Sequence, residues 1–288
     1  MSKQKRDLLK EKRYLRVGVP DHAYGDNSIK TSKYTVWNFL LINLIEQFRK
    51  PANVYFLMIA VLQVIPQISI SHGDPTILMP LLFVVIVSMV KDGIEDHKRS
   101  KSDREENHSK VLVQRNGKFV HEKWSKIWTG EIVKVERDQF LPADLLLLAT
   151  STPKQDCFIE TKNLDGETNL KPKFVQPMVR EIVQDGPTLN KLDGVEFFFE
   201  APSPLIYEFS GSLSAKGVQI GIDINNFPLR NCKLKNTEWI IGVVSFNGHY
   251  SKIMMNSVKS VSKSSDIEKK VGWLLIWLFV LLVFFSKY

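Results

Sequence analysis

Residues 140–173 read FLPADLLLLATSTPKQDCFIETKNLDGETNLKPK, and they combine two kinds of pattern. The runs DLLLLAT and CFIET are short, apolar and bounded by turn residues, which is typical of β-strands. The polar loop that follows contains DGET at 165–168. Gly166 would let the backbone turn sharply, so that Glu167 could project from the loop tip to orient and deprotonate a water molecule. An Asp-Gly turn with no catalytic role is the alternative, because such turns are common.

The β pattern continues on both sides of this stretch. In VLVQRNGKFV at 111–120, Asn116 and Gly117 can supply the positive φ angles of a tight hairpin turn. Further β-type runs are EIVKVE before the opening stretch, and EFFFEA, LIYEFSGSL and EWIIGVVSF after a weakly patterned stretch near 176–195. We therefore expect residues 93–268 to form a mostly β domain with flanking helices.

Composition places few limits on function. Lys and Arg number 39 against 31 Asp and Glu, and the formal charge of +8 is compatible with nucleic acid, an anionic membrane surface or a solvated basic face. The two cysteines, Cys157 and Cys232, do not belong to a CxxC or CxxH pattern that could hold zinc. We expect no metal site and two buried, reduced thiols, with a single disulfide as the alternative.

Two apolar runs precede the β domain. Residues 54–70 and 75–90 contain no Asp, Glu, Lys or Arg, and each is close to the minimum length for crossing a hydrocarbon core. The connecting SHGDP lacks Lys and Arg, whereas RK at 49–50 and the later KDGIEDHKRSK are basic, as the positive-inside rule requires. We predict transmembrane helices at 54–70 and 75–92, with the N-terminus and the β domain in the cytosol. Two buried helices of a soluble bundle are the alternative.

The flanks of these runs define the remaining segments. Residues 1–30 are charged and lack an apolar period, which predicts a basic cytosolic tail, and residues 31–53, which contain FLLINLIEQF, suit an interfacial segment. VGWLLIWLFVLLVFFSKY predicts the start of a third transmembrane helix at 269–288, cut short, so the chain reads as a fragment of a polytopic α-helical membrane protein. In the first span, Pro66 should kink or unwind the helix. Gln63 would belong to a substrate path or merely bond to a neighbouring helix.

These blocks together resemble a known family. The opening stretch is closely similar to the actuator domain of P-type ATPases, and DGET in place of TGE is the form of the fourth class, the phospholipid flippases. NSIKTSKYTVWNFLLINLIEQFRKPANVYFLMIAVLQVIPQIS resembles that class's entry to its first span, and PLLFVVIVSMVKDGIEDHKRSKSD resembles its second. LRNCKLKNTEWIIGVVSFNGHYSKIMMN resembles the later actuator strands, with Asn231 where a glycine is usual.

The resemblance implies a fold and a set of site residues. The fold would be a distorted β-roll actuator domain, in which Glu167 positions the water that attacks an aspartyl phosphate carried by another domain. Asp165, Gly166 and Thr168 would shape that loop. Two other sites match the family. Pro142 and Asp144 belong to a PAD segment with a structural role, and Gln63 occupies a position associated with the lipid path.

The resemblance also implies an ATP-driven flippase that moves phospholipid toward the cytosolic leaflet. The family's DKTGT and GDGxND motifs and its nucleotide-binding domain do not occur in these residues, so ATP and Mg²⁺ are implied only for the full-length protein and we expect these 288 residues alone to be inactive. Expected partners are phospholipid, the membrane, the missing domains and a two-span accessory subunit, but no nucleic acid. The alternatives are a non-enzymatic truncated membrane scaffold or regulator, and an ion-pumping P-type ATPase, which DGET disfavours.

Overall fold

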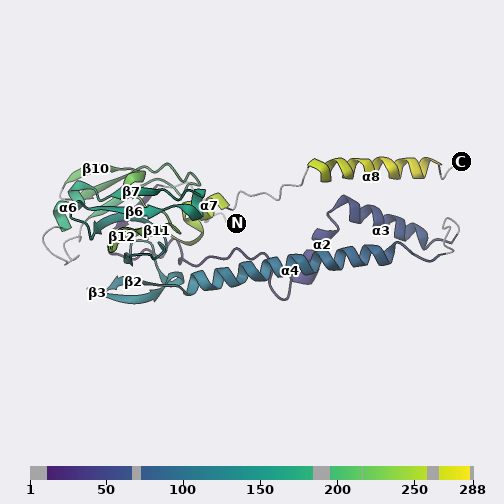
Figure 1. Ribbon diagram of the computed structural model, residues 1–288, viewed down its shortest axis with the longest axis horizontal. Coiled ribbons are helices and arrows are strands. Elements are labelled where there is room, and N and C mark those ends of the chain that lie inside the picture. Colours follow the sequence, from purple (N-terminus) through teal and green to yellow (C-terminus); the bar gives the residue numbers. More distant parts are fainter. Residues whose placement is uncertain (1–11, 67–72, 184–194, 216, 258–265, 286–288) are drawn as a thin grey trace. The chain divides into compact units, whose positions relative to one another are not determined.

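The chain divides into two compact units. A computed structural model describes residues 12–66, 73–183, 195–215, 217–257 and 266–285. The first unit comprises Met1–Ile29 and Arg104–Val261, and the second comprises Lys30–Asp103 and Ser262–Tyr288. The first is built mostly from β-strands and the second from helices (Figure 1). This confirms the mostly β domain with helices that the sequence predicted.

The largest sheet of the first unit has five antiparallel strands in the order β3-β2-β4-β12-β5. Every residue of β5 is buried, as expected for a strand with an apolar run at Leu145–Ala149, and its polar ends Asp144 and Thr150 are buried as well. The strands are β2 (Lys110–Arg115), β3 (Lys118–Lys123), β4 (Ile132–Glu136), β5 (Asp144–Thr150) and β12 (Trp239–Phe246).

Two smaller sheets complete the first unit, with orders β1-β8-β9-β10 and β11-β6-β7. Apolar side chains from all three sheets form one buried core. The strands are β1 (Arg13–Arg16), β6 (Asp156–Glu160), β7 (Leu170–Phe174), β8 (Glu196–Phe199), β9 (Gly211–Ala215), β10 (Val218–Ile222) and β11 (Lys233–Lys235), and the α-helices are α5 (Lys162–Asp165), α6 (Pro177–Val183) and α7 (Lys252–Ser257).

The predicted hairpin is confirmed, but other strands were missed. Asn116 and Gly117 adopt φ angles of 52° and 76°, and Arg115 pairs with Lys118 across the turn. The sequence did not predict β7, because Pro172 is unfavourable in a strand. It is tolerated here because β7 lies at the edge of its sheet.

The segment 13–29 differs from the solvated basic tail that was expected for residues 1–30. Arg13 and Leu15 are buried and Tyr14 and Arg16 are exposed, so residues 13–16 alternate with the period of a strand and pair with β8. Its charged composition hid that alternation. Residues 1–11 lie outside the described part of the chain.

The second unit contains α2 (Phe39–Gln47), α3 (Pro51–Gln63), most of α4 (Leu78–His108) and α8 (Asp266–Phe285). Helix α3 begins with Pro51 at its first turn, where proline is favoured. It ends at Gln63, so Pro66 follows the helix rather than kinking it, and part of the predicted span at 54–70 lies outside the described residues.

The helix boundaries also differ from the predicted spans at 75–92 and 269–288. Helix α4 continues well beyond residue 92, so residues 93–103, which we had placed in the β domain, belong to the second unit. Within the described ranges, no helix is both long enough and apolar enough to cross a membrane.

Candidate functional site

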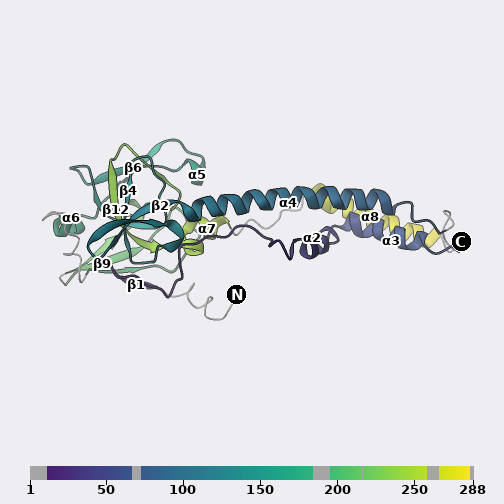
Figure 2. The ribbon, with the colours of Figure 1, turned by 90° about the horizontal axis from the view of Figure 1, so that it is seen from below.

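The DGET loop joins β6 to the edge strand β7 (Figure 2). Its first part is the one-turn helix α5, which ends when Gly166 adopts φ 77° and ψ −2° and donates its amide to the Lys162 carbonyl at 3.1 Å. Open space surrounds the position that a Cβ would take at Gly166, so the left-handed backbone, not crowding, is the reason for glycine.

Asp165 is the hub of the loop. Its Oδ1 accepts hydrogen bonds from the Thr161 hydroxyl at 2.9 Å and the Glu167 amide at 3.0 Å. Its Oδ2 accepts them from the Lys171 ammonium at 2.6 Å and the Tyr207 hydroxyl at 3.2 Å. Only 9% of the Asp165 side chain is exposed, so this carboxylate shapes the loop and is not presented to solvent.

The hydrogen bonds of Asp165 determine its charge state. Burial by itself would raise its pKa, but the hydrogen bonds from Lys171, the Glu167 amide and Thr161 outweigh burial and lower the pKa to about 2. The hydrogen bond with Asp165 in turn raises the pKa of Lys171. Asp165 is therefore ionised over the whole physiological pH range.

Glu167 lies at the exposed tip of the loop, next to the exposed Thr168. Its side chain is 55% exposed, and its Oε2 lies 3.1 Å from the Lys171 Nζ. The Asp165 side chain fixes the Glu167 backbone, while the carboxylate stays accessible to a group on another molecule or domain. This arrangement suits a base that acts on a phosphoryl group from outside the loop.

The PAD segment has a different environment. Asp144 is fully buried, and its two oxygens accept the backbone amides of Arg230 at 2.8 Å and Lys252 at 2.7 Å. Burial outweighs these hydrogen bonds and raises the Asp144 pKa to about 6. The Pro142 carbonyl accepts a hydrogen bond from the Asn27 side chain at 3.0 Å. These contacts join distant parts of the first unit and reach no surface, which fits a structural role.

Sequence reasoning did not identify the buried network around Arg230. The Arg230 guanidinium donates to Glu106 Oε1 at 2.9 Å and 3.1 Å and to Asn27 Oδ1 at 2.7 Å. The neighbouring Asn231 has a φ of 60°, which explains how it can stand where a glycine is usual. In the sequence, the only sign of an unusual backbone here was Asn231 at a position where the resembling family usually has glycine.

Gln63 and Pro66 belong to the second unit, whereas the loop residues belong to the first. The Gln63 amide donates to the Thr76 hydroxyl at 3.2 Å, and its carbonyl oxygen accepts the Ile77 amide at 3.2 Å. Gln63 thus ties the end of α3 to the residues that precede α4. Both polar ends of this side chain are used locally, and its partners Thr76 and Ile77 precede α4 and are not part of a neighbouring helix.

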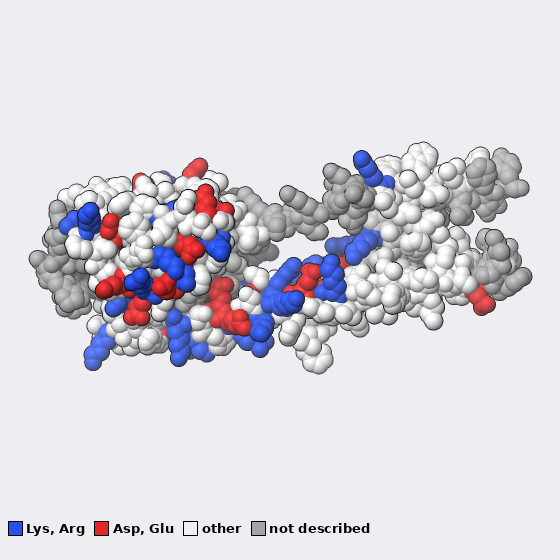
Figure 3. All heavy atoms as spheres, viewed as in Figure 1, with Lys and Arg blue, Asp and Glu red and all other residues white. Residues whose placement is uncertain are grey.

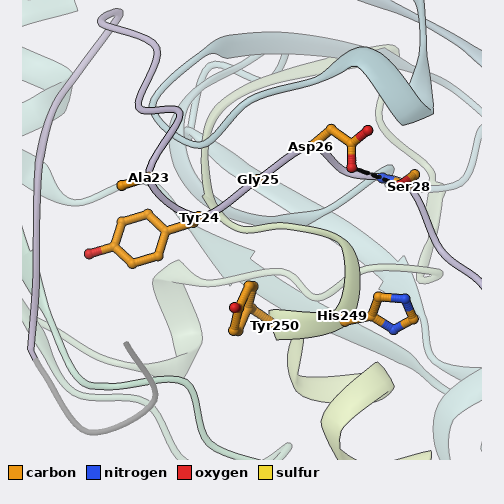
Figure 4. A pocket seen from close by; sticks show the side chains of 7 residues that line it. All are labelled: Ala23, Tyr24, Gly25, Asp26, Ser28, His249 and Tyr250. Atoms are coloured by element: carbon orange, nitrogen blue, oxygen red, sulfur yellow. Dashed lines mark hydrogen bonds between the residues drawn. The ribbon is translucent and has the colours of Figure 1, made fainter. Parts of the chain in front are cut away.

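A cavity of about 290 Å³ lies elsewhere in the first unit (Figure 4). Tyr24, Asp26, His249 and Tyr250 are among its lining residues. Next to it the buried guanidinium of Arg13 stacks 3.6 Å from the Tyr24 ring centroid, and its Nε and Nη2 have no hydrogen-bond partner among the described residues. Burial lowers the Arg13 pKa to about 10. None of the site residues predicted from sequence lies here.

The two cysteines lie in the core of the first unit. Cys157 and Cys232 are buried free thiols, as predicted, and burial raises the pKa of each to about 12. Among the described residues, no three His, Cys, Asp or Glu side chains gather closely enough to hold a metal ion.

Comparison with known proteins shows which family the chain resembles. Residues 7–77 match the family described as phospholipid-translocating ATPase N-terminal. The chain is 43% identical over 262 residues to phospholipid-transporting ATPase ID of Mus musculus, covering 90% of this chain and 21% of the relative. It is 38% identical over 285 residues to phospholipid-transporting ATPase 1 of Arabidopsis thaliana, covering 97% and 24%. The chain thus spans about a fifth to a quarter of the length of these curated relatives, and the resemblance seen in the motifs is confirmed.

Proposed function

We propose that this chain, as a relative of the phospholipid-transporting ATPases, supplies the dephosphorylation loop of an ATP-driven phospholipid flippase. The observation that carries the proposal is the contrast between the two carboxylates of DGET. Asp165 is buried in hydrogen bonds that fix the loop, whereas Glu167 is exposed at its tip. A fixed loop with one accessible carboxylate is what a water-positioning base requires.

The proposed step is hydrolysis of an aspartyl phosphate carried by another domain. Glu167 accepts a proton from a water molecule as the water oxygen attacks phosphorus. The bond between phosphorus and the aspartyl oxygen breaks, and the electron pair stays on that oxygen. The products are a free aspartate carboxylate and inorganic phosphate, and the proton remains on Glu167 until it is lost to solvent.

We assign ATP, Mg²⁺ and the phosphorylated aspartate to other domains of a full-length protein. Residues 1–288 contain no DKTGT sequence, and we propose that by themselves they neither form the phosphoenzyme nor hydrolyse ATP. The cargo would be phospholipid moving toward the cytosolic leaflet, with a two-span accessory subunit as a further partner. We propose no nucleic-acid partner for the basic charge.

We further propose that the helical unit lies in and on a membrane and that the β-rich unit is cytosolic. Large apolar side chains are exposed along α4 and α8, among them Phe83, Ile86 and Trp277. On the face shown in Figure 3, charged side chains cover the β-rich unit and one section of α4, and the apolar parts of the second unit carry few. Lipid contact would remove this apolar surface from water.

Helix α2 fits the interfacial position that we propose for residues 31–53. Its Asn43 and Gln47 are buried, and both amides donate to Asp92 of α4 at 3.0 Å and 2.9 Å. Leu40 and Leu41, on its remaining surface, are exposed. A helix with one polar, tethered face and one apolar, exposed face is suited to the plane of a membrane surface.

The test is the lifetime of the phosphoenzyme in a full-length protein that contains this chain. Glu167→Gln should slow phosphoenzyme decay by about 10²-fold or more, because the amide cannot accept the proton from water. The exposed Glu136 on β4 provides the matched control, and Glu136→Gln should leave decay unchanged. Normal decay in Glu167→Gln would contradict the proposal, because phosphoenzyme hydrolysis would then not depend on this carboxylate.

A further inference from the structure

Lys171 is the cation closest to the proposed base. It lies on β7, where its backbone is paired with Ile159 of β6, so its position is set by a sheet and not by the loop. Its ammonium contacts Asp165 Oδ2 at 2.6 Å and Glu167 Oε2 at 3.1 Å. One side chain on a strand thus binds both carboxylates of DGET.

A residue from a distant part of the chain supports this lysine. Tyr207 donates its hydroxyl to the same Asp165 oxygen that binds Lys171, at 3.2 Å. The Lys171 Nζ lies 5.4 Å from the centroid of the Tyr207 ring, within the range of a cation–π contact. Asp165 and Tyr207 therefore restrict the ammonium to the side of the loop that faces Glu167.

The ion pair between Lys171 and Glu167 contributes little to the folding stability of the first unit. The Lys171 side chain is 31% exposed and that of Glu167 is 55% exposed, and exposed ion pairs contribute little to folding because water and salt screen them. A positioning role fits better. A carboxylate that approaches an anionic phosphoryl group is repelled by it, and a cation bound to that carboxylate reduces the repulsion.

We propose that Lys171 is a positioning residue for Glu167, whose ammonium holds the carboxylate against β7 and offsets its repulsion from the phosphoryl group. The inference rests on the proposed function of Glu167. It predicts that the positive charge at residue 171 matters specifically for dephosphorylation, whereas phosphoenzyme formation does not depend on it.

The experiment compares three variants in a full-length protein that contains this chain. Lys171→Met should slow phosphoenzyme decay about tenfold or more, because a displaced catalytic group loses rate steeply. Lys171→Arg keeps the charge and should retain decay within about threefold of wild type. Lys162→Met removes the charge of an exposed lysine of the same loop and should leave decay unchanged. The rate of phosphoenzyme formation should be the same in all three, which a general folding defect would not produce.

The outcomes separate this inference from the proposed function. If Glu167→Gln slows decay but Lys171→Met does not, the positioning role is wrong and the role of Glu167 stands. If Glu167→Gln has no effect, the proposed function itself fails. Equal slowing by Lys171→Arg and Lys171→Met would also overturn the inference, because it would show that charge is not the operative property.

If Lys171→Met does not fold, the inference can still be tested by a measurement that leaves Lys171 unchanged. In the 288-residue chain, the ¹⁵N-labelled Lys171 ammonium signal should shift when Glu167→Gln is introduced, because one of its two carboxylate contacts becomes a neutral amide. The same signal should not move in Glu136→Gln. An unchanged Lys171 signal in Glu167→Gln would overturn the inference.

Discussion

At the scale of a single residue, Asp165 holds the DGET loop together. It accepts hydrogen bonds from Thr161, the Glu167 amide, Lys171 and Tyr207. We predict that Asp165→Asn destabilises the first unit by about 1–2 kcal/mol, because hydrogen bonds to a charged group are lost or weakened. Urea unfolding of the 288-residue chain, followed by circular dichroism, measures this change. Glu136→Gln is the control, and a stability equal to wild type in Asp165→Asn would show that the hub contributes nothing.

The pKa of Asp165 predicts a pH dependence with a definite sign. Its folded pKa of about 2 lies below the value of about 3.9 for an unfolded aspartate. The ionised carboxylate therefore adds stability above pH about 4, and this contribution is lost as the pH falls toward 2. A ¹³C titration of the Asp165 carboxyl should give a midpoint near 2, and Asp165→Asn should remove the corresponding loss of stability. A midpoint at 4 would show that the hydrogen bonds to Asp165 do not lower its pKa.

Sequence reasoning identified some of these residues because their signals are local. Gly166 and Glu167 follow from the need for a left-handed turn and an accessible carboxylate within a few residues. Lys171 and Tyr207 could not be found in that way, because their roles depend on strand pairing and on a segment more than thirty residues away. The same limit applies to Arg230, whose partners Asn27 and Glu106 are remote in sequence.

At the scale of elements, α4 fixes the segment 29–34 through one polar stripe. Asp96 accepts the amides of Lys33 and Tyr34 at 2.6 Å and 3.2 Å, and Asp103 accepts those of Thr31 and Ser32 at 2.8 Å and 3.0 Å. Asp96 and Asp103 are seven residues apart and so occupy the same helix face. These backbone amides do not belong to a strand or a helix, so the two carboxylates accept the hydrogen bonds that a carbonyl group would accept in regular secondary structure.

This stripe gives an element-scale prediction with an internal control. Asp103→Ala should speed hydrogen exchange at the Thr31 and Ser32 amides by about tenfold or more, because each amide loses a hydrogen bond to a charged acceptor. Asp96→Ala should act instead on the Lys33 and Tyr34 amides. Residue-resolved hydrogen exchange by NMR measures both. Equal acceleration of all four amides in either variant would show that the segment opens as a whole and is not fixed residue by residue.

The sequence was a better guide to strands than to helix boundaries. Buried strands such as β5 and the hairpin of β2 and β3 follow from runs and turns that lie within a few residues. Helix α4 was predicted to end near residue 92, because the apolar run ends there, but it continues to His108. Its polar half is stabilised by contacts with the segment 29–34, and no window along α4 alone contains that information.

At the scale of the whole molecule, the chain combines a β-rich unit and a helical unit that differ in surface chemistry. The first unit encloses one large apolar core, whereas the second leaves many large apolar side chains exposed. In water such a surface favours association with other apolar matter. The chain passes between the units at three points, after Ile29, within the continuous helix α4 and after Val261.

The proposed membrane placement gives the last prediction. When the chain is expressed in cells and membranes are prepared as sealed inside-out vesicles, proteinase K should degrade the first unit and leave a protected fragment that contains α3 and the apolar half of α4. The reason is that residues 51–90 contain no Lys or Arg, while basic residues flank them on both sides, which places both flanks on the cytosolic face. Right-side-out vesicles are the control, because in them the first unit should survive. Loss of α3 and α4 in sealed inside-out vesicles would show that the helical unit does not enter the bilayer, and survival of the first unit there would reverse the orientation.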